Sequence, residues 1–394
     1  MRSEWTKKKL SDIADFNPRE TIKKGAIAKK IPMDVLRPFY RDIPYYTEEC
    51  FSGGTKFRNG DTIMARITPC LENGKTAQVS ILNNGEVGFG STEYIVFRAK
   101  EGIADKDYLY YLVCSPKVRE PAIKSMVGSS GRQRVQTDVV KNLEIDVPPL
   151  VEQEKIGSFL KALDNKIALN DRINKNLEQQ AQAYFDELFV VNADPNWSEC
   201  TLSDIGSVVA GGTPSKSKPE YYADQGIAWI TPKDLSLNKS KFISHGENDI
   251  SELGFSKSSA AKMPAGTILF SSRAPIGYIA IAQNEVTTNQ GFKSVIPNEN
   301  IGTAYLYFLL KNLLPTIEGM ASGSTFKEIS GSAMKSVPTV MPDADTIQLF
   351  SSFCEPVFRE QEILEAENQR LSALRNSLLP KLMSGELDVS DINL

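Results

Sequence analysis

The stretch WTKKKLSDIADF, residues 5–16, decides how this chain is organised, because its pattern returns as WSECTLSDIGSV at residues 197–208. Further matches follow in the same order: GDTIMARITP (60–69) with GTILFSSRAP (266–275), and DYLYYL (107–112) with AYLYFL (304–309). Self-similarity in a fixed order is typical of duplicated structural units. The sequence therefore predicts two domains of one fold, which present two similar surfaces.

Each domain is followed by a stretch with helical spacing. Residues 151–194 contain one glycine, Gly157, and no proline, and their apolar residues recur in steps of three and four. The spacing predicts coiled-coil stripes along two long helices. The stripe residues that we expect to bury a helix or dock a partner are Ile156, Leu160, Leu163, Ile167 and Leu177 in the first stretch and Leu364, Leu371, Leu374 and Leu378 in the second.

Polar residues and prolines interrupt these stripes. Asn170 and Asn174 are polar at consecutive stripe positions, where they either set the register of the helix pair or mark a slip in the predicted register. Pro356 is expected to kink the second helix or to mark a later start. Pro380 is expected to disturb its last turn.

Short β-rich runs such as TIMARI and TILFSS, broken by glycine, asparagine and proline, alternate with helical stretches in each half. The predicted fold class is mixed α/β (α+β). Two duplicated domains would be separated by two long antiparallel coiled-coil helices, as a dumbbell with pseudo-twofold symmetry. The expected boundaries are a first domain at 1–150, a first long helix at 151–190, a second domain at 191–342, and a second long helix with a C-terminal tail at 343–394.

Composition limits the classes of function. The chain has 394 residues, 41% hydrophobic and 24% charged, which is typical of a globular protein with room for two cores. No apolar run approaches the roughly 18 residues of a membrane-spanning helix, and the start MRSEWTKKKL has no apolar stretch, so we expect a cytoplasmic protein without membrane contact. Five scattered cysteines favour reduced thiols over disulfides or a zinc site. The net charge of −4 leaves nucleic-acid binding open, because residues 1–150 hold 24 Lys+Arg against 19 Asp+Glu.

Three stretches are similar to catalytic motifs but depart from them. NGKT at 73–76 resembles the end of a phosphate-binding loop, yet Pro69 stands where that loop requires glycine. DVPPL at 146–150 resembles the Pro-Pro-aromatic motif of amino-methyltransferases, but Val147 breaks the spacing and Leu150 is not aromatic. His245 is the only histidine, which excludes sites that need two. The sequence predicts a chain that performs no catalysis.

Polar loops rich in small residues, several of them with arginine, occupy corresponding places in the two halves. ARITPCLENGKTA, GSTEY and GSSGRQRV lie in the first half, and SSRAPIG, TTNQGF and SGSTFKEI lie in the second. Arginine bridges guanine N7 and O6, asparagine and glutamine bridge adenine N6 and N7, and Ser, Thr and Lys bind phosphates. These loops are therefore either readers of DNA bases or solvated turns.

The chain resembles the specificity subunits of type I restriction-modification systems over essentially its full length. The resemblance rests on W-x4-LSDI at the start of each half, GDTIMARITPCLENGK and GTILFSSRAPIGYIAI in mid-domain, VPPLVEQEKIGSFLKALDNKI ahead of the first long helix, and LRNSLLPKLMSGEL near the C-terminus. One departure is MPDADTIQLFSSF at 341–353, which replaces a Pro-Pro-x-x-Glu-Gln-x-x-Ile entry and leaves the start of the second helix open.

The resemblance implies two target recognition domains, each of which reads one half of a split, asymmetric sequence in double-stranded DNA. The paired helices would act as a ruler between them and as the docking surface for two methyltransferase subunits, which restriction subunits would join. S-adenosylmethionine, ATP and Mg would be bound by those partners, so no cofactor or metal is expected on this chain. Two domains that read the same face of B-DNA must lie about 34 Å apart or a multiple of that distance. Long helices between the domains would provide such a separation.

Motif position and side-chain chemistry select the expected DNA contacts. They are Arg66, Thr68, Asn73, Lys75, Thr92, Arg132, Gln133 and Arg134 in the first domain, and Ser272, Arg273, Asn289, Gln290, Thr325 and Lys327 in the second. Two other classes of function remain as alternatives. A coiled-coil adaptor that does not bind DNA would explain the helices but not the paired loops. A self-contained DNA methyltransferase or nuclease would need a glycine-rich cofactor loop and an intact Pro-Pro-aromatic motif.

Overall fold

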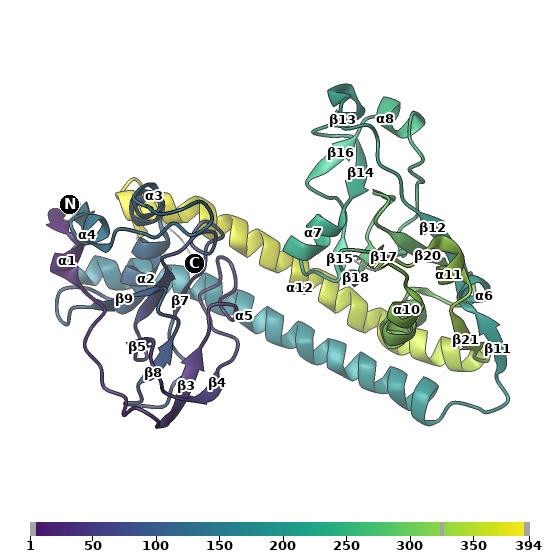
Figure 1. Cartoon of the computed structure of the whole chain (residues 1–394), viewed down its shortest axis with the longest axis horizontal. Coiled ribbons are helices and arrows are strands. Elements are labelled where there is room, and N and C mark those ends of the chain that lie inside the picture. Colours follow the sequence, from purple (N-terminus) through teal and green to yellow (C-terminus); the bar gives the residue numbers. More distant parts are fainter. Residues whose placement is uncertain (1–4, 324–326, 390–394) are drawn as a thin grey trace. The chain divides into compact units, whose positions relative to one another are not determined.

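The computed structural model describes residues 5–323 and 327–389. The chain divides into two compact units. The first contains the residues up to Asn170 together with those from Glu367 onward, and the second runs from Asp171 to Ala366. Two long helices, α5 (Leu150–Asp186) and α12 (Ala344–Ser384), each contribute one part to each unit. The units are described separately below (Figure 1).

The first unit combines small sheets with short helices. Its strands are β1 (Thr6–Lys9), β2 (Ala14–Phe16), β3 (Ile27–Ile31), β4 (Thr47–Cys50), β5 (Thr55–Phe57), β6 (Thr62–Ala65), β7 (Thr76–Gln78), β8 (Gly88–Gly90), β9 (Tyr94–Ala99) and β10 (Glu144–Val147). Its short helices are α1 (Leu10–Ile13), α2 (Lys106–Cys114), α3 (Pro116–Lys124) and α4 (Thr137–Lys141). The strands form sheets in the orders β1-β10, β2-β9-β6-β7 and β4-β3-β8-β5.

The second unit repeats this order with small insertions. Its strands are β11 (Ser198–Thr201), β12 (Gly206–Ala210), β13 (Tyr222–Ala223), β14 (Ile227–Ile230), β15 (Phe242–Ile243), β16 (Asn248–Ile250), β17 (Ile268–Ser272), β18 (Ile276–Ala282), β19 (Thr287–Thr288), β20 (Lys293–Pro297) and β21 (Pro338–Met341). Its helices are α6 (Leu202–Ile205), α7 (Pro232–Leu237), α8 (Glu252–Ser256), α9 (Thr303–Asn312), α10 (Leu314–Met320) and α11 (Gly331–Lys335), with a π-helical turn η1 (Glu187–Val191) and a 3-10 turn η2 (Pro219–Tyr221). Its sheets are β11-β21, β12-β20-β17-β18-β15 and β13-β16-β14-β19.

The duplicated Trp-x4-Leu-Ser-Asp-Ile motif has the same structural role in both units. The tryptophan precedes a strand that pairs antiparallel with the strand just before the long helix, β1 with β10 and β11 with β21. The indole Nε1 of Trp5 donates to Glu152 in the first turn of α5, at 3.1 Å. The indole of Trp197 donates to Asp343, the residue before α12, at 3.0 Å. The predicted duplication and the mixed helix-and-sheet class are therefore confirmed.

The aspartate of the motif explains why a single helical turn forms at LSDI in each unit. Asp12 accepts a hydrogen bond from the backbone N–H of Lys9 at 2.8 Å, and Asp204 accepts one from Thr201 at 2.8 Å. A carboxylate at the third helical position that binds back to the N-cap satisfies an N–H that the helix leaves unpaired. The leucine and isoleucine of both turns are fully buried in their unit's core.

The long helices pack against the globular domain of each unit as well as against each other. In the first unit, Ile156, Phe159 and Leu160 of α5 belong to the same buried cluster as Tyr108 and Leu112 of α2. In the second, Ala181 and Phe185 of α5 and Phe350 of α12 belong to one cluster with residues of α9. Apolar burial of this kind is the main source of helix stability in proteins.

Within each unit, α5 and α12 run antiparallel (Figure 1). In the first unit, Asp164 meets Arg375 and, further along α5, Asn170 meets Glu367. In the second unit, Asn174 accepts through its backbone oxygen from Gln361 at 3.1 Å, and the rings of Tyr184 and Phe353 are 4.8 Å apart. Of the predicted stripe, Ile156, Leu160, Leu163, Ile167 and Leu364 are buried, Leu177, Leu371 and Leu378 are partly buried, and Leu374 is 44% exposed. Next to Leu374, Arg375 is the buried residue.

Asn170 sets a polar contact between the helices. It is fully buried, and its Nδ2 donates to Glu367 at 2.7 Å and to Asn368 at 2.9 Å. The expectation that Pro356 marks a later start of the second helix is wrong. Helix α12 begins at Ala344, before Pro356, and continues past Pro380 to Ser384, so Pro356 does not mark a later start. Both prolines are exposed. The helix tolerates them because water can bind the carbonyl that lacks an N–H partner in the preceding turn.

Candidate nucleic-acid interface

Three of the loops predicted in the first domain meet at one corner. The backbone N–H of Arg66 donates to the oxygen of Glu93 at 2.9 Å, which joins the loop after β6 to the loop before β9. The N–H of Thr68 donates to Gln133 at 3.0 Å, and the N–H of Val135 donates to Arg66 at 2.8 Å. These two hydrogen bonds attach the loop that carries Gln133 to the loop after β6. We call this place the first corner and define it by Arg66, Thr68, Glu93, Gln133 and Arg134.

An ion-pair cluster lies at the first corner. Arg134 donates through Nε and Nη2 to Glu93, with Nε at 2.9 and 3.0 Å from the two oxygens and Nη2 at 2.7 Å from Oε1. The Nε of Arg66 lies 3.7 Å from the same carboxylate. The hydrogen bond from Arg134 is the first cause that lowers the pKa of Glu93, so the carboxylate stays ionised. Two cations therefore share one anion at the surface.

The remaining predicted residues of the first domain differ in availability. Asn73, Thr92 and Arg132 are exposed. Lys75 is half-buried, and its Nζ donates to the backbone oxygen of Met33 at 2.9 Å. The Oγ1 of Thr68 faces the sulfur of Met126 at 3.8 Å. Lys75 thus ties loops together, whereas the exposed side chains are open to a ligand.

The second domain forms a corresponding corner. The N–H of Ser272 donates to Gly291 at 2.7 Å, and the N–H of Ile329 donates to Ser272 at 3.1 Å. Arg273 and Glu328 face each other in a β-bridge, and Arg273 Nη1 lies 3.3 Å from Glu328 Oε2. We define the second corner by these five residues. Ser272 is fully buried, and its Oγ lacks a hydrogen-bond partner within residues 5–323 and 327–389.

The other predicted residues of the second domain lie beside this corner or outside the described residues. Asn289 accepts from the N–H of Gly291 at 2.8 Å, and it lines a cleft together with the exposed Gln290 and the buried Trp229. Lys327 is exposed. Thr325 lies outside the described residues.

The two corners have equivalent backbones but different charges. In the matching stretches 60–69 and 266–275, Ser272 occupies the position of Arg66, and both stretches end in a cis X-Pro bond. The bridge from Ile67 to Arg134 in the first domain corresponds to the bridge from Arg273 to Glu328 in the second. Position by position, Ile67 is replaced by an arginine and Arg134 by a glutamate.

Sequence reasoning missed Glu93 and Glu328. Both lie inside stretches predicted to contact DNA, GSTEY and SGSTFKEI. The expected contacts in those stretches were limited to cationic, amide and hydroxyl side chains. The available signal was the presence of acidic residues in these sets of loops, Glu72 and Glu93 in the first half and Glu328 in the second.

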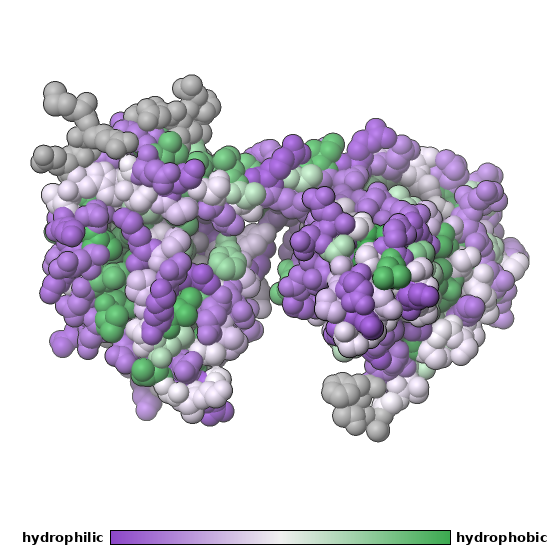
Figure 2. Space-filling view, turned by 90° about the horizontal axis from the view of Figure 1, so that it is seen from above, coloured by the Kyte–Doolittle hydropathy of each residue, from purple (hydrophilic) through white to green (hydrophobic). Residues whose placement is uncertain are grey.

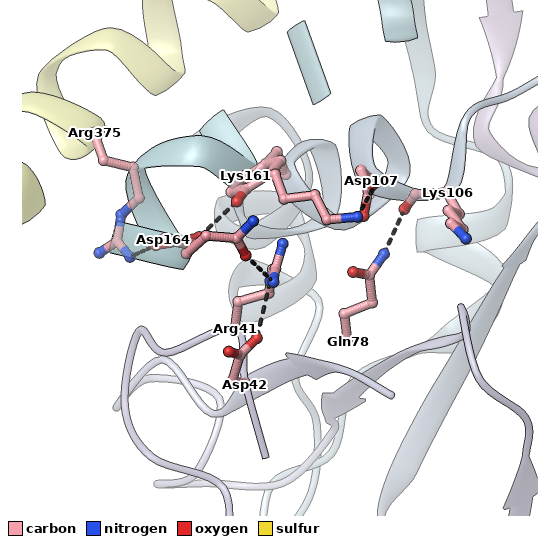
Figure 3. A network of polar contacts seen from close by, with 10 residues as sticks. Arg41, Asp42, Gln78, Lys106, Asp107, Lys161, Asp164 and Arg375 are labelled. Carbon is pink, nitrogen blue, oxygen red and sulfur yellow. Dashed lines mark hydrogen bonds and ion pairs between the residues drawn. The ribbon is translucent and has the colours of Figure 1, made fainter. Parts of the chain in front are cut away.

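Buried polar clusters attach each domain to both long helices. In the first unit, Asp164 of α5 accepts from the hydroxyl of Tyr111 at 2.6 Å and from Arg375 of α12 at 2.5 Å. Next to Asp164, Asn165 accepts from Arg41 at 2.8 Å. Figure 3 shows Asp164 with Arg375 and Arg41 around it. Burial, and then the Asp164 charge, raise the pKa of Tyr111, so its hydroxyl remains a donor.

The second unit uses different residues for the same purpose. Glu178 of α5 pairs with Lys241 and, at 2.6 Å, with Lys311 of α9. Lys241 also donates to Gln361 of α12 at 2.7 Å. Burial raises the pKa of Glu178, but the two lysines outweigh it, and the net pKa is lowered. Burial lowers the pKa of Lys241. Each domain is thereby held in a fixed orientation on its own part of the helix pair.

Residues 5–323 and 327–389 contain neither a metal-binding cluster nor a membrane-spanning helix. No group of three or more His, Cys, Asp or Glu side chains in this part of the chain could hold a metal ion. None of the helices described there has the length and apolar character needed to cross a membrane.

Comparison with known proteins identifies the class. The family model described as the type I restriction modification DNA specificity domain matches residues 2–179 and 195–373, once over each half of the chain. The chain belongs to this family, that of the type I restriction-modification specificity subunits.

Individual relatives agree with this class. The HindI specificity subunit of Haemophilus influenzae is 24% identical over 407 residues, which cover 84% of this chain and 87% of that protein. The MjaIX specificity subunit of Methanocaldococcus jannaschii is 39% identical over 190 residues, but the match spans only 44% of that protein and 46% of this chain. The crystal structure of a type I S subunit from M. genitalium has a similar fold, with a TM-score of 0.62 at 16% identity over 96% of each chain.

Proposed function

We propose that this chain is the DNA-sequence reader of a type I restriction-modification complex and recognises a bipartite, asymmetric target in double-stranded DNA. The observation that carries the proposal is the pair of corners, which share a backbone frame and differ in side-chain charge. The regions 1–150 and 191–342 are the two target recognition domains in this proposal. Each would bind one half-site, and because the corner residues differ, the half-sites would have different sequences.

The proposal assigns catalysis to partner subunits. The family's methyltransferase and restriction subunits would bind S-adenosylmethionine, ATP and Mg, and this chain would direct them to one DNA sequence. It would work in the cytoplasm, where that DNA is.

The long helices supply a candidate docking surface for two methyltransferase subunits. Exposed apolar side chains lie along both helices and are interspersed with hydrophilic ones, as the space-filling view shows for one face (Figure 2). In the first unit they are Val151, Leu169 and Leu374, and in the second they are Ile173, Leu349, Phe353 and Ile363. Apolar side chains gathered on a surface are typical of protein interfaces.

Methylation mapping tests the proposed function. DNA from cells that express this chain with its methyltransferase subunit is sequenced by a single-molecule method that detects modified bases, and cells without the chain serve as the control. A split asymmetric motif that is methylated only when the chain is present is the expected result. An unchanged methylation pattern with both subunits expressed would reject the proposal and favour an adaptor without a role in DNA recognition.

A further inference from the structure

Glu93 holds the guanidinium of Arg134 along one edge. Glu93 accepts from Nε and Nη2, which form the side edge of the planar group. Guanidinium has five N–H donors in a rigid fork, so this contact leaves both N–H groups of Nη1 and the outer N–H of Nη2. Nη1 donates one long hydrogen bond, at 3.4 Å, to the backbone oxygen of Arg132, and within the described residues it donates no other.

The terminal edge of Arg134 keeps N–H donors that Glu93 does not use, and these could bind a guanine. The terminal Nη1–Nη2 edge of arginine donates two parallel hydrogen bonds to guanine N7 and O6. The Arg134 side chain is 43% exposed, whereas that of Glu93 is 23% exposed. The carboxylate is thus the more buried partner of the pair, and the arginine is the one more open to a ligand.

The second corner lacks this arrangement. There Arg273 contacts Glu328 through Nη1, the terminal nitrogen, at a single distance of 3.3 Å. The other oxygen of Glu328 lies 3.9 Å from Lys293. A single contact through one nitrogen fixes the plane of the guanidinium less well than the paired Nε and Nη2 contacts of Arg134, so the two corners differ in how they position their arginine.

We propose that Arg134 reads a guanine in the half-site of the first domain and that Glu93 is the positioning residue that fixes the plane of its fork. This inference rests on the proposed function, because it names the chemistry by which one domain recognises DNA. Glu93 contributes selectivity in two ways. It restricts the rotamers of a long side chain before binding, and its negative charge opposes phosphate contacts that Arg134 would otherwise make with any sequence.

The test is a base-by-base binding profile. The full chain is assembled with its methyltransferase subunits, and equilibrium binding is measured at fixed salt to duplexes in which each base pair of both half-sites is changed in turn. The variants are Glu93→Gln, which keeps the shape and removes the charge, and Arg134→Lys, which keeps the charge and removes the fork. Glu120→Gln is the matched control, because Glu120 lies on the same domain in an exposed pair with Lys124 at 3.9 Å.

The expected result is local to one base pair. In the unmodified complex one guanine of the first half-site should give about tenfold or more discrimination. Both Glu93→Gln and Arg134→Lys should reduce that ratio several-fold at this position and leave the second half-site unchanged, while Glu120→Gln should keep the full profile.

Three outcomes overturn the inference. One is an unchanged profile in both variants. Another is a uniform loss of affinity at every position, which would mean that the pair is only structural. The third is a Glu93→Gln variant that binds all sequences more tightly with its base preference intact, which would make Glu93 a simple repulsive charge. If the unmodified complex shows no base preference at all, the proposed function itself fails.

Discussion

Two arginines of this protein are paired with carboxylates in different surroundings. Glu93 holds Arg134 at the surface of the first corner, whereas Asp164 holds Arg375 in the interior. The first pair leaves donors for a ligand, and the second uses its charge to join elements of one unit. In the proposed function, a carboxylate–arginine pair therefore serves DNA recognition where it is exposed and joins structural elements where it is buried.

The Asp164→Asn substitution should destabilise the first unit. Both partners are less than a tenth exposed, with Asp164 at 7% and Arg375 at 9%. Removing the charge of one partner leaves a buried guanidinium without compensation, which costs about 3–5 kcal/mol. We expect the lower end, because Asn376 also accepts from Arg375, at 3.1 Å. Urea denaturation of the full chain measures the change.

A suitable control for that measurement is Asp15→Asn. Asp15 is 56% exposed and lies 3.9 Å from Lys100, so its removal should change stability by less than about 0.5 kcal/mol. Equal midpoints for the two variants would show that the Asp164 pair contributes nothing specific.

The Glu93 ion pair should have a pH signature in the acid range. Arg134 lowers the pKa of Glu93 below the ordinary 4.5. For a carboxyl whose pKa is depressed on folding, the stabilisation is present above the unfolded pKa and is lost as pH falls through the folded pKa. The stability of Glu93→Gln should therefore fall less steeply than that of the unmodified chain below about pH 4.5. Urea midpoints measured from pH 6 to pH 3 check this, and parallel curves would contradict it.

At the scale of elements, the heptad stripes have a double role. Spacing alone predicted helices that pack on each other, and that packing is confirmed within each unit. The stripe of α5 also packs into the domain core, where Ile156 and Leu160 join residues of α2. A heptad pattern shows that one face of a helix is buried but not what covers it. For this reason the sequence could not indicate how much of the stripe the domains themselves bury.

Helix α12 contains a proline at a position where its removal should increase stability. Pro356 is exposed and lies twelve residues inside α12, which begins at Ala344. Proline in a helix interior lacks the N–H that binds the preceding turn and is less favourable than alanine by up to about 3 kcal/mol. Pro356→Ala should therefore raise the urea midpoint. Glu355→Ala, at the neighbouring exposed position, should leave the midpoint nearly unchanged, and a lowered midpoint for Pro356→Ala would show that the proline is required.

The elements also show how far the sequence could predict the site. The loops at Arg66, Thr68 and Gln133 were selected by chemistry, and the structure brings them together at one corner. Their roles as DNA contacts stay predictions. The contact between Glu93 and Arg134 joins residues that are 41 positions apart, so no local pattern could pair them. The backbone bond of Lys75 is equally non-local, because Met33 lies 42 positions away.

At the scale of the whole molecule, duplication supplied two copies of one backbone frame. Both units share a cis prolyl bond, matching β-bridges and a tryptophan that binds at the start of a long helix. Exchange of Ile67 and Arg134 for Arg273 and Glu328 changes the chemistry of a corner without altering its hydrogen-bonded backbone. In the proposed function, the chain could therefore change one half-site while it keeps the other.

The long helices should set the spacer between the half-sites in the proposed function. We suggest the insertion of three heptads into α5 after Asn170 and into α12 after Ala366, where the chain passes from one unit to the other. Three heptads keep the apolar stripe in phase and add about 32 Å at about 1.5 Å per residue. That length is close to one turn of B-DNA, so both domains would meet the same face of the duplex.

The methylated motif of this variant should keep both half-sites and gain about nine base pairs of spacer, since duplex DNA rises about 3.4 Å per base pair. Single-molecule sequencing of modified DNA measures the motif directly. The same insertion in α5 alone is the control. It shifts one helix against the other, breaks contacts such as Asn170 with Glu367 or Asn174 with Gln361, and should abolish methylation of any split motif. An unchanged spacer in the doubly extended chain would show that the helices do not measure the distance between the half-sites.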